Sequence, residues 1–157
     1  MTFQRVTIWF PIACWVLAGG ILAGCRKADA WKVKTYPASG TVIINGKPAE
    51  GVIVNFHPIG KPTDIRESIP WGKVQPDGTY HLRTYQEGDG APPGEYHVTL
   101  KWKPSPSSVA DKLNHVYQDP EKSVWKFTIA PGQNDLPQIE LKNVKVLNIP
   151  SEPRRSR

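Results

Sequence analysis

The chain has 157 residues and a net charge of +6, with 16 prolines and 13 glycines spread along it. This length supports one domain with a modest core and argues against two domains. Lys and Arg are scattered among Asp and Glu except in Arg154-Arg155-Ser156-Arg157, and no basic module is recognisable, so the charge pattern argues against nucleic-acid binding. Frequent glycine and proline predict short strands joined by turns.

The first 24 residues have the layout of a secretory signal peptide. A short positive start ends at Arg5, and an uncharged apolar run over 6–24 follows and ends in small residues. We expect this run to form the signal helix. An uncleaved transmembrane helix is the alternative, because 19 uncharged residues just span a hydrocarbon core. Pro11 weakens that helix, although membranes tolerate proline better than water does.

Four residues at the end of this run, Leu22-Ala23-Gly24-Cys25, resemble the bacterial lipobox. The resemblance implies that the signal peptidase recognises Leu22, Ala23 and Gly24 and cuts before Cys25. It also implies that the Cys25 thiol receives a diacylglyceryl group and that the new amino terminus is acylated, for instance by palmitate. Each buried methylene contributes about 0.8 kcal/mol, so several acyl chains make a permanent anchor.

Two further observations concern the anchor. Cys14 would be lost on cleavage, which leaves Cys25 as a lone cysteine and excludes an intramolecular disulfide or a cysteine metal site. Arg26 follows Cys25, where an Asp would favour retention in the inner membrane of enteric-type bacteria. The resemblance therefore implies an outer-membrane lipoprotein facing the periplasm, and the covalent lipid makes the membrane a partner.

The rest of the chain is predicted to be a tether over 25–38, one β-sandwich over 39–143, and an edge segment with a basic tail over 144–157. Asn45-Gly46 indicates a tight hairpin, and Pro76-Asp77-Gly78 indicates a turn. Apolar residues at alternating positions indicate seven strands, at 41–44, 52–56, 72–74, 79–84, 94–102, 124–129 and 136–141. A further edge strand is considered over 144–149.

Alternation assigns one side of each strand to the core. The predicted inward residues are Val42, Ile44, Val52, Val54, Phe56, Tyr80, Leu82, Tyr96, Val98, Leu100, Trp125, Phe127, Ile129, Ile139 and Leu141. Ser108 with Asp111 resembles a helix N-cap, and Val109, Leu113, Val116 and Tyr117 follow at helical spacing. We therefore expect one short helix over 109–117.

Several turn motifs together resemble the carboxypeptidase regulatory-like, or transthyretin-like, domain of small bacterial lipoproteins. The matching pieces are Ser39-Gly40-Thr41-Val42, Asn45-Gly46-Lys47-Pro48, Gly51 to Phe56, Asp77-Gly78-Thr79-Tyr80, GDGAPPGEYHV at 88–98, Tyr117-Gln118-Asp119-Pro120, Ser123 and Pro131-Gly132-Gln133-Asn134. The resemblance covers about residues 39–142. It implies an all-β fold, a seven-stranded Greek-key sandwich of transthyretin-like or Ig-like type, and it implies no substrate.

No motif predicts catalysis, a metal or a cofactor. If strands 79–84 and 94–102 pair, His81 and His97 would be neighbours and could bind a metal weakly with Glu95, but solvated histidines are the preferred interpretation. Trp71 and Trp102, with Trp31, could form a sugar-stacking platform, and core or edge packing is the alternative. We therefore expect a non-catalytic accessory domain, anchored in the bacterial cell envelope, with an envelope protein or glycan as partner. A carbohydrate- or peptide-binding module is the alternative, and an enzyme comes third.

Overall fold

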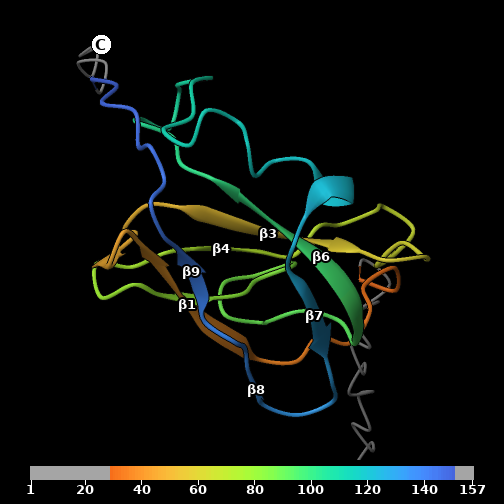
Figure 1. The fold of residues 1–157 in the computed structure, drawn as a ribbon. Helices are drawn as coiled ribbons and strands as arrows, with labels where there is room; N and C mark the ends of the chain where they lie inside the picture. The colour runs from red at the N-terminus through yellow and green to blue at the C-terminus, as the bar shows by residue number, and fades with distance from the viewer. Residues whose placement is uncertain (1–28, 151–157) are drawn as a thin grey trace, which may run out of the picture.

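The computed structural model describes residues 29–150, which are nearly all strand, turn and loop. Two sheets pack against one shared core, as in a β-sandwich (Figure 1). The strands are β1 (Ala38–Ile44), β2 (Lys47–Pro48), β3 (Ile53–Pro58), β4 (Trp71–Lys73), β5 (Thr79–His81), β6 (Gly94–Lys101), β7 (Lys126–Ile129), β8 (Asn134–Asp135) and β9 (Ile139–Leu141). The predicted all-β class is confirmed, and the predicted signal helix lies outside the described residues.

The first sheet is organised around β1. Along one edge β1 pairs antiparallel with β5 and then with β2, and along its other edge it pairs parallel with β8 and β9. The turn between β1 and β2 is the predicted one, because Asn45 and Gly46 have φ values of 52° and 77° and allow the tight reversal. The two-residue turn therefore joins β1 to β2, whereas β5, β8 and β9 reach β1 from distant parts of the chain.

The second sheet has the order β4-β3-β6-β7, with every neighbouring pair antiparallel. The longest pairing joins β3 and β6, in a register that sets Phe56 opposite Val98 and His57 opposite His97. Since strand side chains alternate between faces, Phe56 and Val98 point into the core and the two histidines point out. This outer face carries the polar residues of the sheet.

The core contains all the predicted inward residues except Trp125, which is half-buried and packs against the others. Phe56 is central, with its ring centroid 5.9 Å from that of Tyr96 and 6.1 Å from that of Phe127. Tyr80 is completely buried, and burial raises the pKa of its hydroxyl well above the usual value. Gly40 lies under this ring, where a Cβ would approach the Tyr80 hydroxyl to 2.6 Å.

The predicted helix over 109–117 is wrong. Residues 102–118 form a loop with turns, and the only helical element of the described chain is the 3₁₀ turn η1 (Pro120–Lys122). Asn114 and His115 adopt positive φ values of 54° and 60°, which no α-helix accommodates. Asp111 is buried and organises the loop, because its carboxylate accepts hydrogen bonds from the backbone N–H of Trp102 (2.7 Å) and of His115 (2.9 Å).

The edge strand considered over 144–149 is also absent from the described structure. This segment is fixed by other bonds: the Asn45 side chain bonds the backbone N–H and C=O of Val144, and the Leu147 N–H donates to the Lys112 carbonyl. Beyond Leu141 the chain therefore crosses the end of the sandwich that carries the loop 102–118 instead of extending a sheet.

Candidate functional site

The predicted lipidation site, Leu22 to Cys25, lies outside the described residues. The first described residues nevertheless show how the chain enters the domain. Tyr36 exchanges two backbone hydrogen bonds with Ala91, at 2.9 and 3.0 Å. The Val33 N–H donates to the Tyr85 hydroxyl, and the Trp31 ring packs edge-on against the Tyr85 ring at 5.2 Å. The last part of the predicted tether is therefore attached to the sandwich.

The structure does not bring Trp71 and Trp102 together. Trp71 begins the edge strand β4 and pairs with Asn55, so its indole lies on the outer face of the second sheet. Trp102 follows β6 one residue beyond the Lys101–Ile53 pair, is half-buried, and packs against the core. Trp31 lies at a third place, beside Tyr85. These three rings do not form the shared platform that the sequence suggested as one possibility.

Each of these indoles also has a cation at its face. The Arg83 guanidinium lies 3.8 Å from the Trp71 ring centroid, and the Lys112 ammonium lies 5.0 Å from that of Trp102. A sugar that stacked on either ring would have to share or displace this cation. At Trp71 the stacked arginine itself becomes part of any binding surface.

A groove of about 390 Å³ lies beside Trp71, where the two sheets meet. The backbones of Trp71 and Arg83 exchange two hydrogen bonds, at 2.9 and 2.8 Å, and this bridge joins β4 to the chain that follows β5. Gly72 permits the close approach, because a Cβ there would lie 2.7 Å from the His81 carbonyl oxygen. The groove is lined by Trp71, Gly72, Lys73, Gln75, His81, Arg83, Glu87 and Gly88.

The polar groups of this groove are suited to an anionic group. Within residues 29–150, neither Arg83 nor Lys73 forms an ion pair, so their N–H donors can take a ligand. The Trp71 indole holds the Arg83 guanidinium by cation–π attraction, and this guanidinium can bind a carboxylate through two parallel N–H···O hydrogen bonds. Sequence reasoning missed Arg83. The hairpin signal at Pro76-Asp77-Gly78 could have found it, because strands around this turn place residue 83 opposite residue 71.

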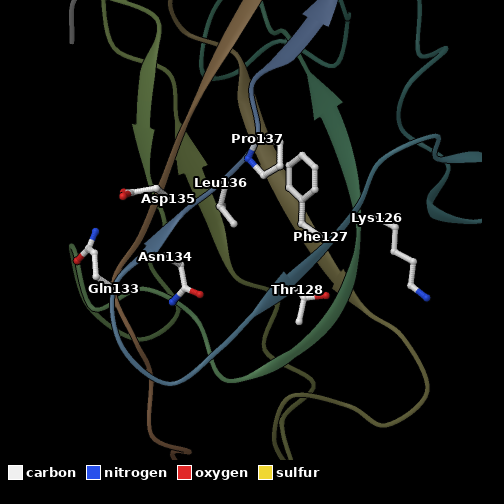
Figure 2. A pocket seen from close by; sticks show the side chains of 8 residues that line it. All are labelled: Lys126, Phe127, Thr128, Gln133, Asn134, Asp135, Leu136 and Pro137. Carbon is white, nitrogen blue, oxygen red and sulfur yellow. The ribbon is translucent and has the colours of Figure 1, made fainter.

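A second cleft, of about 410 Å³, opens between the edge strands β7 and β8. Figure 2 shows Phe127 and Leu136 directed into the space between the strands and Lys126 directed away from it. Asn134 closes the bottom of the cleft, since its amide donates to the carbonyls of Ala130 and Gly132 and its Oδ1 accepts from the Ala130 N–H. Thr128, Gln133 and Asp135 add polar groups to its lining, but among residues 29–150 no cluster of metal-ligating side chains lies there.

The histidines are arranged differently from the considered pairing. His81 belongs to the first sheet and His97 to the second, so the suggested neighbourhood of these two with Glu95 is wrong. His97 instead faces His57, whose Nε2 lies 2.9 Å from the Thr99 hydroxyl. Burial, followed by the neighbouring His97, lowers the pKa of His57. Among residues 29–150, no three His, Cys, Asp or Glu side chains are grouped as metal ligands.

The more buried carboxylates accept hydrogen bonds from backbone N–H groups. The Asp64 carboxylate accepts hydrogen bonds from the Arg66 and Ser68 N–H groups and from the Tyr85 hydroxyl. Burial alone would raise the pKa of Asp64, but these bonds outweigh it and hold the pKa below its usual range. Asp89 likewise accepts from the backbone N–H groups of Thr84, Tyr85 and Gln86. Because the oxygens of Asp64 and Asp89 already accept hydrogen bonds that stabilise turns, these acids are poor candidates for acid–base catalysis.

The chain matches no model of a known protein family, and no curated protein is similar to it. Within residues 29–150 there is also no helix long and apolar enough to cross a membrane.

Proposed function

We propose that this protein is an exported, lipid-anchored, non-catalytic accessory domain of the bacterial cell envelope. Leu22-Ala23-Gly24-Cys25, at the end of an uncharged run, carries the proposal, because its order and position resemble the lipobox. Cys25 would be acylated, and the domain would lie at the outer membrane and face the periplasm. It would act through contact with another envelope component.

The architecture supports this proposal. Two sheets with one core resemble the carboxypeptidase regulatory-like domain that the turn motifs suggested, and we propose its seven-stranded Greek-key topology for this chain. A buried active site would use the acids with the least exposed carboxylates. These acids already accept hydrogen bonds from backbone N–H groups: Asp64, Asp89 and Asp111. A non-catalytic role agrees with this use of the carboxylates.

The test of the anchor is the intact mass of the full chain expressed in a bacterium and extracted from its envelope. We expect a chain that begins at Cys25 and carries the mass of three acyl chains. Cys25→Ser should leave an unacylated, unprocessed precursor, while Cys14→Ser, the matched control within the signal segment, should leave the mature mass unchanged. An unmodified Cys25 in the wild-type protein would refute the proposal, and turnover of ester, peptide or glycoside substrates would refute its non-catalytic part.

The groove beside Trp71 favours a second candidate function, a carbohydrate- or peptide-binding module of the envelope. Its stacked Arg83 and nearby Lys73 would select a ligand with a carboxylate, such as an acidic sugar or a peptide C-terminus. Binding on arrays of such glycans and peptides should be lost in Arg83→Ala and Trp71→Ala and kept in Trp102→Ala, which removes an indole with its own cation elsewhere. Arrays without a hit, or equal losses in all three variants, would count against the module.

A further inference from the structure

We propose that one end of the domain, formed by residues 31–34 and the loop 59–70, lies directly against an anionic lipid surface. We call it the proximal end. The inference rests on the proposed attachment to the membrane near residue 25, and it adds which side of the sandwich faces the bilayer. The opposite side, where the described chain ends, would then face the envelope partner. Figure 1 shows residues 29–37 (orange) beside the loop 59–70 (yellow), with the last described segment after β9 (blue) across the molecule.

The length of chain after the anchor restricts how the domain can sit. Trp31 is six residues after Cys25, so even a fully extended chain places it within about 21 Å of the lipid attachment. A domain of about 120 residues has a diameter of roughly 35 Å. The sandwich therefore stays near the bilayer, and its proximal end is the part that the chain holds closest to the lipid.

Residues 31–34 are held against the loop 59–70 by a direct contact and through Tyr85. The Arg66 guanidinium stacks on the Trp31 ring, 3.8 Å from its centroid. Tyr85 joins the two segments, because its hydroxyl accepts from the Val33 N–H at 3.1 Å and donates to Asp64 at 2.8 Å. Since Asp64 is itself bonded to the turn at Ser68, the loop presents a defined surface to the bilayer.

The chemistry of this surface suits lipid headgroups. Ile65 is 86% exposed in the loop 59–70 and directly precedes Arg66, which stacks on Trp31. The amphipathic ring of tryptophan belongs to the class enriched at membrane interfaces. Lys34, Lys61 and Arg66 are exposed and outnumber the one exposed acid of the loop 59–70, Glu67, while the carboxylate of Asp64 is buried and bonded. Each such cation near an anionic leaflet adds to the attraction. The sequence places Arg26 and Lys27 directly after Cys25, which extends the positive charge toward the anchor.

Exposure of an aliphatic residue does not by itself identify the surface. Val109 is also 86% exposed, but it lies in the loop 102–118, which packs against the last described residues through the Lys112–Leu147 hydrogen bond. That end is distant from the anchor, and we assign it no lipid contact. Val109 therefore provides a control for Ile65, because both residues are β-branched and equally exposed at opposite ends of one rigid domain.

The experiment compares nitroxide labels on Ile65→Cys and Val109→Cys, each in full-length Cys14→Ser protein extracted from the envelope. The labels are read in detergent and in vesicles containing phosphatidylglycerol, by their collisions with a water-soluble nickel chelate. We expect the collision rate at position 65 to fall several-fold on the vesicles and the rate at position 109 to stay unchanged. Equal collision rates at both positions on the vesicles would overturn the inference.

Charge variants test the anionic part of the proposal. Lys34→Glu with Lys61→Glu should lower the docked-to-undocked ratio at least about 25-fold, since each cation near the surface contributes about fivefold. Lys47→Glu with Lys145→Glu makes the same change in net charge away from the proximal end and should have no effect. Equal effects of the two pairs, or equal docking on vesicles of phosphatidylcholine alone, would refute a specific anionic contact.

The same samples separate this inference from the proposed function. Their intact mass reports whether Cys25 is acylated. An unacylated chain refutes the lipid anchor. Ile65→Cys and Val109→Cys are then labelled in a background with both Cys14→Ser and Cys25→Ser, so that a single nitroxide reports whether the proximal end docks on anionic vesicles. An acylated chain with equally accessible labels refutes the docking surface alone.

Discussion

Replacing Gly90 with alanine tests how firmly the entering chain is attached to the sandwich. Gly90 has a φ of 80°, and a Cβ built on it would lie 1.7 Å from the Tyr36 carbonyl oxygen and 2.8 Å from the Pro37 Cα. Real Cβ contacts stay beyond 3.0 Å, so the Tyr36 carbonyl oxygen must move by more than an ångström and the Pro37 Cα by about 0.2 Å. Both neighbours are backbone, so no side-chain rotation relieves the clash.

The expected loss follows from the bonds that this movement breaks. Tyr36 and Ala91 exchange two backbone hydrogen bonds, each of which contributes about 1 kcal/mol net. An alanine held at positive φ costs at least about 1 kcal/mol more. We therefore expect Gly90→Ala to lower the free energy of unfolding by about 3 kcal/mol, which corresponds to about 12 °C in the midpoint of thermal unfolding for a domain of this size.

Gly88→Ala is the matched control. Gly88 has a similar φ of 74°, but nothing lies within 4 Å of its built Cβ. Its substitution therefore carries only the backbone strain, about 1 kcal/mol or roughly 4 °C. Thermal unfolding followed by circular dichroism compares the two variants. Equal midpoints for Gly88→Ala and Gly90→Ala would refute the attachment of residues 36–37, and with it the restricted position of the domain at the membrane.

Three further predictions concern the interior and the sheet face. Asp111→Ala should lower the free energy of unfolding by about 3 kcal/mol in urea, because the N–H groups of Trp102 and His115 lose a charged acceptor, and Asp111→Asn, which keeps one acceptor oxygen, should lose less. Tyr80→Phe should leave stability unchanged or raise it by about 1 kcal/mol in the same assay, because the buried Tyr80 hydroxyl has no hydrogen-bond partner among the described residues; a large loss would reveal one. The folded-state pKa of His57 lies below the unfolded value of 6.5, so the unfolded chain binds the proton first as pH falls. The urea concentration at the unfolding midpoint should therefore decrease as the pH is lowered below 6.5 and stay constant at higher pH. His57→Gln should remove more of this pH dependence than His81→Gln, and equal profiles would contradict the assignment.

Local signals predicted much of this fold because they depend on neighbouring residues alone. The positive φ values at Asn45, Gly46 and Gly78 are what their turn motifs require. Alternation identified the buried residues of β3 and β6, since a strand with one face in a core must repeat every two residues. These signals indicate pairing only between strands joined by a short turn, and carry no information on which distant strands pair. The parallel pairing of β1 with β8 and β9 therefore became visible only in the structure.

The loop 102–118 shows how a local signal can mislead. Val109, Leu113 and Val116 repeat at helical spacing, yet only Leu113 is buried, while Val109 and Val116 are exposed. What decides the conformation is Asp111, which reaches back across the chain to the Trp102 N–H at the end of β6. That bond is a tertiary contact, so periodicity could not reveal it. The Trp71–Arg83 bridge is a different case, because the turn signal at Pro76-Asp77-Gly78 could have placed these two residues opposite each other.

The net positive charge of the chain lies mainly outside the described domain. Between residues 29 and 150, Lys and Arg outnumber Asp and Glu by only one, against six in the whole chain. The excess therefore lies in the flanking segments, with Arg26 and Lys27 beside the proposed anchor and Arg154, Arg155 and Arg157 at the other end of the chain. Cations beside the anchor would strengthen contact with anionic lipid, whereas the arginines after residue 150 follow a chain that leaves from the opposite side of the domain. The proposed lipid contact therefore depends on the cations beside the anchor and at the proximal end, and not on the net charge of the described domain.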